Sequence, residues 1–113
     1  MEKRRGTRHK KRLMIRFGQT ETKNLGFIED ISATGIRVKT KTVFKPSTKL
    51  QVEISLEDSD ETMKAEGVVM WAKKVPPGMS HRVQSGMGIT FLRIDTILHD
   101  FLLKLNYKIN GSG

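Results

Sequence analysis

Residues 24–43 read NLGFIEDISATGIRVKTKTV and contain two strand-like runs around a short polar turn. The runs are residues 24–31 and 36–43, and the turn lies at 32–35. In the second run, apolar or hydroxyl side chains alternate with cationic ones, which is the period of a strand that buries one face and exposes the other. The stretch therefore predicts two neighbouring strands joined by a tight connection.

Strand-like runs continue on both sides of this stretch. Four more segments have the length and patterning of strands, namely residues 13–17, 50–56, 62–75 and 86–92. Gly67 lies inside the longest of them, where a glycine marks a β-bulge or a close approach of two backbones. Trp71 lies further along the same run, and we expect its side chain in the core. The chain is thus predicted to be mostly β.

The pattern changes at Asp95, after which the apolar spacing becomes helical. One stripe of a helix collects Ile97, Leu98, Phe101, Leu102 and Leu105. Asp95 or Thr96 can cap this helix, and we expect it to close an open end of the β structure in preference to docking on a partner. The sequence therefore divides into a flexible basic arm (1–12), a β structure (13–94), a helix (95–109) and a flexible tail (110–113), with a single domain over 1–109.

Charge is concentrated at the amino end. The 113 residues include 21 lysines and arginines against 12 acidic residues, a formal net charge of +9. Residues 1–16 hold eight of these cations and one of the acids, so the rest of the chain is nearly neutral. A dense basic arm on a near-neutral body attracts polyanions such as nucleic acid, a phosphorylated small molecule or an anionic membrane surface. We expect a phosphate-rich partner.

Composition and motif content exclude several kinds of chemistry. The absence of cysteine excludes disulfides, thiolate zinc sites and cysteine nucleophiles, and the three histidines are scattered. The acidic run 57–61 matches no calcium loop and is typical of a hairpin connection. Ser32 has Asp30 nearby but no neighbouring histidine, and the sequence contains no Walker loop, no GxGxxG and no aromatic RNP-type motif. No metal site and no enzyme activity are predicted.

The sequence predicts no membrane-spanning segment. No apolar stretch approaches the roughly 20 residues that span a bilayer, and the amino end lacks the apolar block of a signal peptide. We therefore expect a cytoplasmic binding protein with no membrane insertion.

Two short motifs carry the chemistry of binding. The first is Arg4-Arg5-Gly6-Thr7-Arg8 in the arm, which sets two guanidinium groups four residues apart. The second is Asp30-Ile31-Ser32-Ala33-Thr34-Gly35, the polar turn between two strands. In this turn the Asp30 and Ser32 side chains can bond backbone amides or face a ligand, and Gly35 permits a positive φ.

With these motifs in this order, the sequence resembles the PilZ domain family of cyclic di-GMP receptors. The resemblance rests on an RRxxR arm (Arg4, Arg5, Arg8), a strand ending Arg16-Phe17, a DxSxxG turn (Asp30, Ser32, Gly35), the strand from Val69 to Trp71, and Gly88-Ile89-Thr90-Phe91. It implies an all-β fold, a six-stranded antiparallel PilZ-type β-barrel with a C-terminal α-helix. It also implies cyclic di-GMP as the ligand and an unidentified downstream protein as the partner.

The resemblance further implies a role for each motif residue. Arg4 and Arg8 would grip the ligand's phosphates and the Hoogsteen edges of its guanines, with Arg5 as a supporting cation. Asp30, Ser32 and Gly35 would complete the pocket on the barrel surface. The chemistry fits, because a planar guanidinium pairs bidentately with a phosphate or with guanine O6 and N7, which lysine cannot do. A carboxylate can in turn accept from guanine N1–H and the 2-amino group.

Alternatives stay open at this stage. Arg12 pairs with Arg8 or with Arg16 in the same RxxxR spacing, and we prefer Arg4 and Arg8 because Arg8 lies nine residues before Phe17, the usual family spacing. Arg12 and Arg16 are then expected on the outer face of the first strand. A second interpretation is a basic β-barrel that binds nucleic acid through its arm, although we expect no exposed aromatic residues on which bases could stack. A PilZ-like module with a silent pocket, docking on an acidic protein, is a third.

Overall fold

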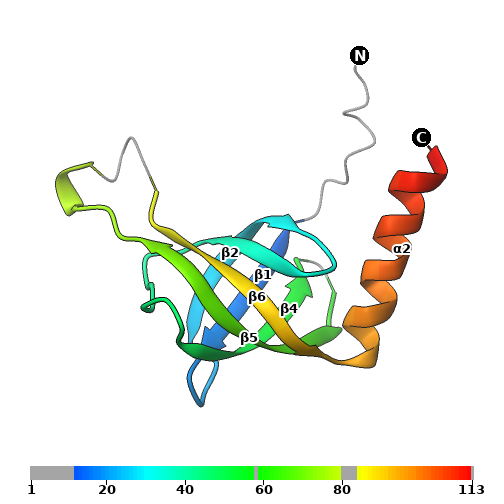
Figure 1. Cartoon of the computed structure of the whole chain (residues 1–113), viewed down its shortest axis with the longest axis horizontal. Helices are drawn as coiled ribbons and strands as arrows, with labels where there is room; N and C mark the ends of the chain where they lie inside the picture. Colours follow the sequence, from blue (N-terminus) through cyan, green and yellow to red (C-terminus); the bar gives the residue numbers. More distant parts are fainter. Residues whose placement is uncertain (1–11, 58, 80–83, 113) are drawn as a thin grey trace.

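The described part of the chain forms one closed antiparallel barrel. The computed structural model describes residues 12–57, 59–79 and 84–112. Six strands are present there: β1 (Leu13–Gly18), β2 (Asn24–Ile31), β3 (Gly35–Lys39), β4 (Lys49–Leu56), β5 (Thr62–Lys73) and β6 (Gly86–Ile94). They are hydrogen-bonded in the order β1-β2-β3-β6-β5-β4, and β4 pairs back onto β1 (Figure 1). The six-stranded antiparallel barrel with a C-terminal helix is therefore confirmed.

Period-two patterning fills the barrel. In β1, Ile15 and Phe17 point inward and are fully buried, while Arg16 between them is exposed. Ile15 lies opposite Ile54 of β4, another fully buried side chain. Because side chains alternate between the two faces of a strand, each apolar set reaches the interior only in this register. The barrel interior is thus a packed apolar core.

The strand predicted over residues 36–43 is shorter in the structure, where β3 ends at Lys39. The cause is Thr40, whose hydroxyl donates to the Leu25 carbonyl at 2.9 Å and accepts from the Thr42 N–H at 3.1 Å. A hydroxyl that bonds the backbone two residues on turns the chain. The following loop crosses one end of the barrel.

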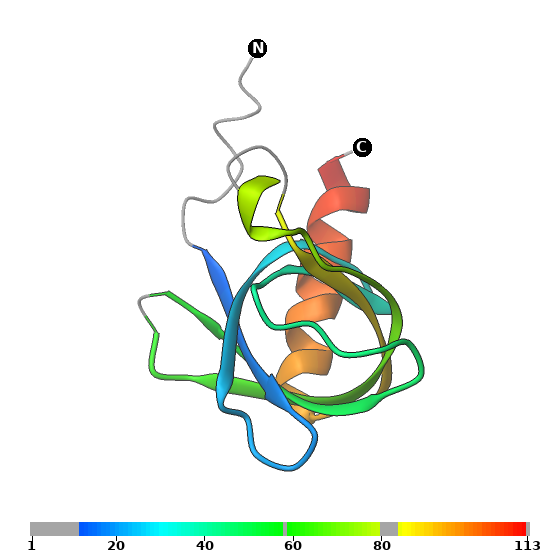
Figure 2. The same cartoon turned by 90° about the vertical axis from the view of Figure 1, so that its left-hand side faces the viewer.

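Both ends of the barrel are covered. On one end the ring of Phe44 packs edge-on against Phe17, with centroids 6.1 Å apart. On the other lies helix α2 (Thr96–Ser112), which adds Leu98 and Leu102 to the core (Figure 2). Burial of these leucines agrees with the predicted apolar stripe. The helix runs to Ser112, beyond the expected end at residue 109.

Asp95 fixes the start of α2 against the barrel. Its Oδ1 accepts a hydrogen bond from the Leu98 N–H at 2.8 Å, the bond of a helix N-cap. Its Oδ2 accepts from the Lys64 N–H of β5 at 2.9 Å, so one carboxylate joins helix and strand.

The residues that the structure describes include no helix with both the length and the apolar character of a membrane-spanning segment.

Candidate functional site

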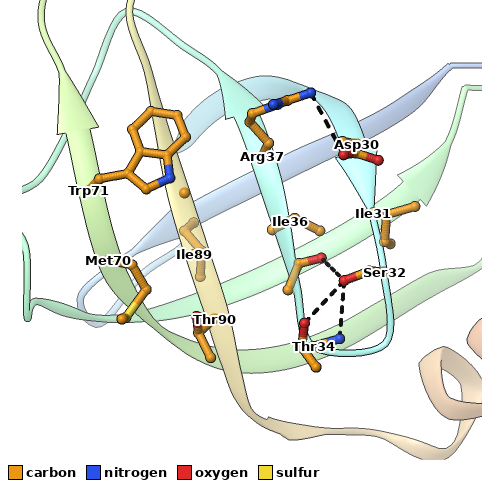
Figure 3. A pocket seen from close by; sticks show the side chains of 12 residues that line it. Asp30, Ile31, Ser32, Thr34, Ile36, Arg37, Met70, Trp71, Ile89 and Thr90 are labelled. Carbon is orange, nitrogen blue, oxygen red and sulfur yellow. Dashed lines mark hydrogen bonds and ion pairs between the residues drawn. The ribbon is translucent and has the colours of Figure 1, made fainter.

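A pocket of about 280 Å³ lies on the outer surface of the barrel, over β2, β3, β6 and β5 (Figure 3). Its lining includes the turn between β2 and β3 and the exposed side chains of Met70 and Trp71 on β5. Pockets that enclose a small-molecule ligand usually measure roughly 300–1,000 Å³. The described walls are therefore suited to holding part of a ligand.

Strand register places a row of four residues across this surface. Asp30 of β2 lies opposite Arg37 of β3, and Arg37 lies opposite Gly88 of β6. Gly88 in turn lies opposite Trp71 of β5. In that order, the row presents a carboxylate, a guanidinium, a bare backbone position and an indole. Figure 3 shows the side chains of Asp30, Arg37 and Trp71 along one edge of the pocket.

The position of Trp71 corrects the expectation that it belongs to the core. Its side chain is 44% exposed. The register between β5 and β6 shifts between Val69 and Trp71, so Met70 and Trp71 are both exposed where a regular strand would bury one of them. A Cβ on Gly88 would overlap the indole, which shows that the ring lies over this glycine.

The turn predicted from the DxSxxG motif is a closed hydrogen-bonded unit. The Ser32 N–H donates to the Gly35 carbonyl at 2.9 Å, and the Ser32 hydroxyl accepts from the Thr34 N–H at 3.2 Å. The Thr34 carbonyl accepts from the Phe91 N–H at 2.8 Å, which fastens the turn to β6. Ser32 therefore shapes the rim of the pocket through its backbone and its hydroxyl.

Gly35 is required for a different reason from the one its motif suggested. The expected positive φ is absent, since no described glycine has one. A Cβ on Gly35 would instead overlap the Ile89 carbonyl oxygen on β6. The glycine is needed because β3 and β6 approach each other too closely here for a side chain.

The Asp30 carboxylate is accessible and has a cationic neighbour. Its side chain is 67% exposed, and its Oδ2 lies 3.7 Å from the Nη2 of Arg37. The Nε of the same guanidinium lies 3.6 Å from Glu29 Oε1. On the other side of Glu29, its Oε2 lies 3.7 Å from Lys39 Nζ. Asp30 thus faces the pocket with one guanidinium beside it.

The predicted arginines of the arm, Arg4, Arg5 and Arg8, lie outside the described residues. Arg12 is the first residue described after them, and its guanidinium carbon lies 4.9 Å from the centroid of the exposed Phe27 ring. Arg16 is exposed on β1, in agreement with its expected position on the outer face of the first strand, whereas Arg12 is exposed but precedes that strand. Phe27 stands on β2 three residues before Asp30, so the arm begins beside the pocket.

Sequence reasoning missed Trp71 and Arg37 as lining residues. Both left a signal. Arg37 is on the exposed face of an alternating strand that follows the turn directly. The four consecutive large apolar residues ending at Trp71 break the period-two pattern, which indicates a bulge. In the part of the chain that the structure describes, no group of three or more histidines and acidic residues could hold a metal ion.

The model of the PilZ domain family matches residues 2–108. The chain belongs to the PilZ domain family. Among solved structures, this PilZ domain is similar to the inhibitor of motility MotI/DgrA of Bacillus subtilis, with a TM-score of 0.63 and 21% sequence identity. The match covers 88% of this chain and 48% of that one, so the PilZ domain spans about half the length of the relative. Among curated proteins, no match was found.

Proposed function

We propose that this PilZ domain is a non-enzymatic cyclic di-GMP receptor that signals to a downstream protein through its arm. The observation that supports it most is the row from Asp30 to Trp71, which sets an accessible carboxylate and an exposed indole on one surface beside the start of the arm. Guanine recognition uses these two groups. A carboxylate accepts from the N1–H and 2-amino edge, and an aromatic face stacks on the base.

The phosphates of the ligand require the arm. Among the described lining residues, Arg37 is the one base and Asp30 the one acid, so this part of the pocket is close to neutral. Cyclic di-GMP carries two phosphate charges, and binding needs further cations to pair with them. Arg4 and Arg8 supply two guanidinium forks, with Arg5 as a supporting cation.

The arm is long enough to bring these groups to the pocket. Arg8 precedes Arg12 by four residues, and an extended chain of that length spans about 14 Å. Arg12 lies over Phe27, and the distance from Phe27 to Asp30 along β2 is about 10 Å. Closure of the arm over the ligand would then change the surface that a partner protein meets, which is how the domain signals.

Calorimetric titration with cyclic di-GMP at about 150 mM salt tests the proposal, because nonspecific charge effects are already damped at that ionic strength. We expect saturable binding that excess GTP does not abolish. Arg8→Ala should abolish it, whereas Lys10→Ala, which removes one charge from the same arm, should leave the affinity within about threefold. Absence of any heat with cyclic di-GMP would refute the receptor function and leave a protein-docking module.

The same titration decides the arginine register. Arg12→Ala should weaken binding far less than Arg8→Ala, since the Arg12 guanidinium already lies over Phe27. Equal losses from the two variants would move the motif to Arg8 and Arg12.

Binding of nucleic acid through the arm is the second candidate. Two exposed aromatic rings, Phe27 at 41% and Trp71 at 44% exposure, now favour it, because stacking aromatics are what single-stranded nucleic acid uses. The salt dependence of binding separates this candidate from the receptor.

A further inference from the structure

Arg37 stands between two carboxylates and touches each with a different edge of its guanidinium. Its Nη2 lies 3.7 Å from Asp30 Oδ2, and its Nε lies 3.6 Å from Glu29 Oε1. The rigid guanidinium fork allows this double contact, which the single ammonium of a lysine does not reproduce. The Arg37 side chain is therefore oriented by one carboxylate while it contacts the other.

The register between β2 and β3 shifts between Ile28 and Asp30, so Asp30 follows an irregularity of its strand. Its side chain is 67% exposed, and the dashed contact in Figure 3 joins it to Arg37. Exposed ion pairs contribute little to the stability of a fold. We therefore expect the ion pair between Arg37 and Asp30 to affect the direction in which the Asp30 carboxylate faces more than the stability of the fold.

We propose that Arg37 sets the selectivity of the pocket for guanine by holding the Asp30 carboxylate toward the base. Asp30 then accepts from the N1–H and the 2-amino group of guanine, and Arg37 acts through it as a positioning residue. The inference rests on the proposed function, because it assumes that a guanine base enters this pocket. It adds a determinant of base selectivity outside the arginine arm and outside the DxSxxG turn.

The test compares cyclic di-GMP with cyclic di-IMP, whose bases lack the 2-amino group and keep the phosphates, O6 and N7. The ratio of the two dissociation constants isolates the contact with the 2-amino group from all contacts that the ligands share. In the wild-type protein we expect a ratio of about ten or more, the size of one hydrogen bond to a charged group. Arg37→Gln should lower the ratio to about two, chiefly by weakening cyclic di-GMP.

Matched variants separate positioning from a general effect. Lys39 lies two residues further along β3 and pairs with Glu29, so Lys39→Gln removes a neighbouring charge and should leave the ratio unchanged. Arg37→Lys keeps the charge and should retain only part of the ratio. In the Asp30→Asn background, Arg37→Gln should lower the ratio no further, because both changes act on one contact. Thermal unfolding of each variant verifies that it is folded.

The outcomes are distinct. If the wild-type protein binds cyclic di-GMP but Arg37→Gln and Arg37→Lys both keep the wild-type ratio, the positioning role is wrong while the receptor function stands. Equal loss of affinity for both ligands also overturns it, since Arg37 would then contact a shared group such as a phosphate. If the wild-type protein binds neither ligand, the receptor function and this inference fall together.

Discussion

Gly88 is the residue on which the position of Trp71 depends. A Cβ there would overlap the indole, so Gly88→Ala must push the ring off the barrel surface. Base stacking on an aromatic side chain contributes about 1–3 kcal/mol. We therefore expect Gly88→Ala to weaken cyclic di-GMP binding by about tenfold. Because Trp71 is the single tryptophan of the chain, its fluorescence should report the displacement directly.

The control for this variant is Gly78→Ala, since a Cβ at Gly78 meets nothing within 4 Å. It should change neither the tryptophan emission nor the affinity. If Gly88→Ala alters the tryptophan emission but leaves the affinity for cyclic di-GMP unchanged, the indole moves but does not stack on the ligand. That result would remove Trp71 from the proposed site.

At this scale, the sequence predicted some site residues and not others for identifiable reasons. Asp30, Ser32 and Gly35 were predicted together because a turn is local and its motif contiguous, and all three line the pocket; their contact with a ligand stays a prediction. Trp71 was misplaced because its direction depends on a bulge in the pairing of β5 with β6. Proximity of Arg37 to Asp30 likewise depends on the register between two strands. Register between strands is a property of the folded barrel.

Helix α2 provides the clearest prediction for a whole element. The side chain of Leu98 on α2 is fully buried in the barrel core, whereas Leu103 on the same helix is 54% exposed. Removing a buried leucine side chain costs about 2–5 kcal/mol through lost burial and the cavity left behind. Leu98→Ala should lower the free energy of unfolding by that amount, as measured by chemical denaturation.

Leu103→Ala is the matched substitution, and exposed sites usually change stability by less than about 0.5 kcal/mol. Similar losses at both positions would mean that the exposed side of α2 is itself covered in solution. A negligible loss at Leu98 would contradict the role of α2 as the cover of the barrel end.

Elements were more predictable than their ends. The bounds of β2 coincide with the strand-like run predicted at residues 24–31, because the strand-forming residues of this run are neighbours in the sequence. The end of β3 was missed because the Thr40 hydroxyl bonds the carbonyl of Leu25, 15 positions away. Such a bond between distant residues has no signature in the local pattern. Gly67 was predicted as a bulge or a close approach of two backbones, and both are confirmed, by the register shift beside it and by the Thr90 carbonyl oxygen that a Cβ at Gly67 would meet at 2.9 Å.

Across the whole molecule, charge and surface chemistry are separated. The described pocket is nearly neutral, and the cations cluster in residues 1–16, at the start of the first strand and before it. Under the proposed function, the barrel would recognise the base and the arm would neutralise phosphate. Each part alone is insufficient, because base contacts without cations leave the phosphates unpaired, and cations without base contacts bind any polyanion.

The salt dependence of binding follows from this division and distinguishes the two candidate functions. Cyclic di-GMP offers two phosphates, so the logarithm of its association constant should fall with the logarithm of salt concentration by a slope of at most about two. A single-stranded oligonucleotide engaged by the whole arm would contact six or more phosphates and give a slope above about four. Titration of both ligands between 50 and 300 mM salt measures the two slopes. We expect cyclic di-GMP to retain most of its affinity at the upper salt concentration while the oligonucleotide dissociates, because base contacts carry no released counterions. The receptor function would be contradicted if cyclic di-GMP lost its affinity at the upper salt concentration while the oligonucleotide gave a shallow slope. The exposed aromatic residues Phe27 and Trp71 would then form a nucleic-acid-binding surface.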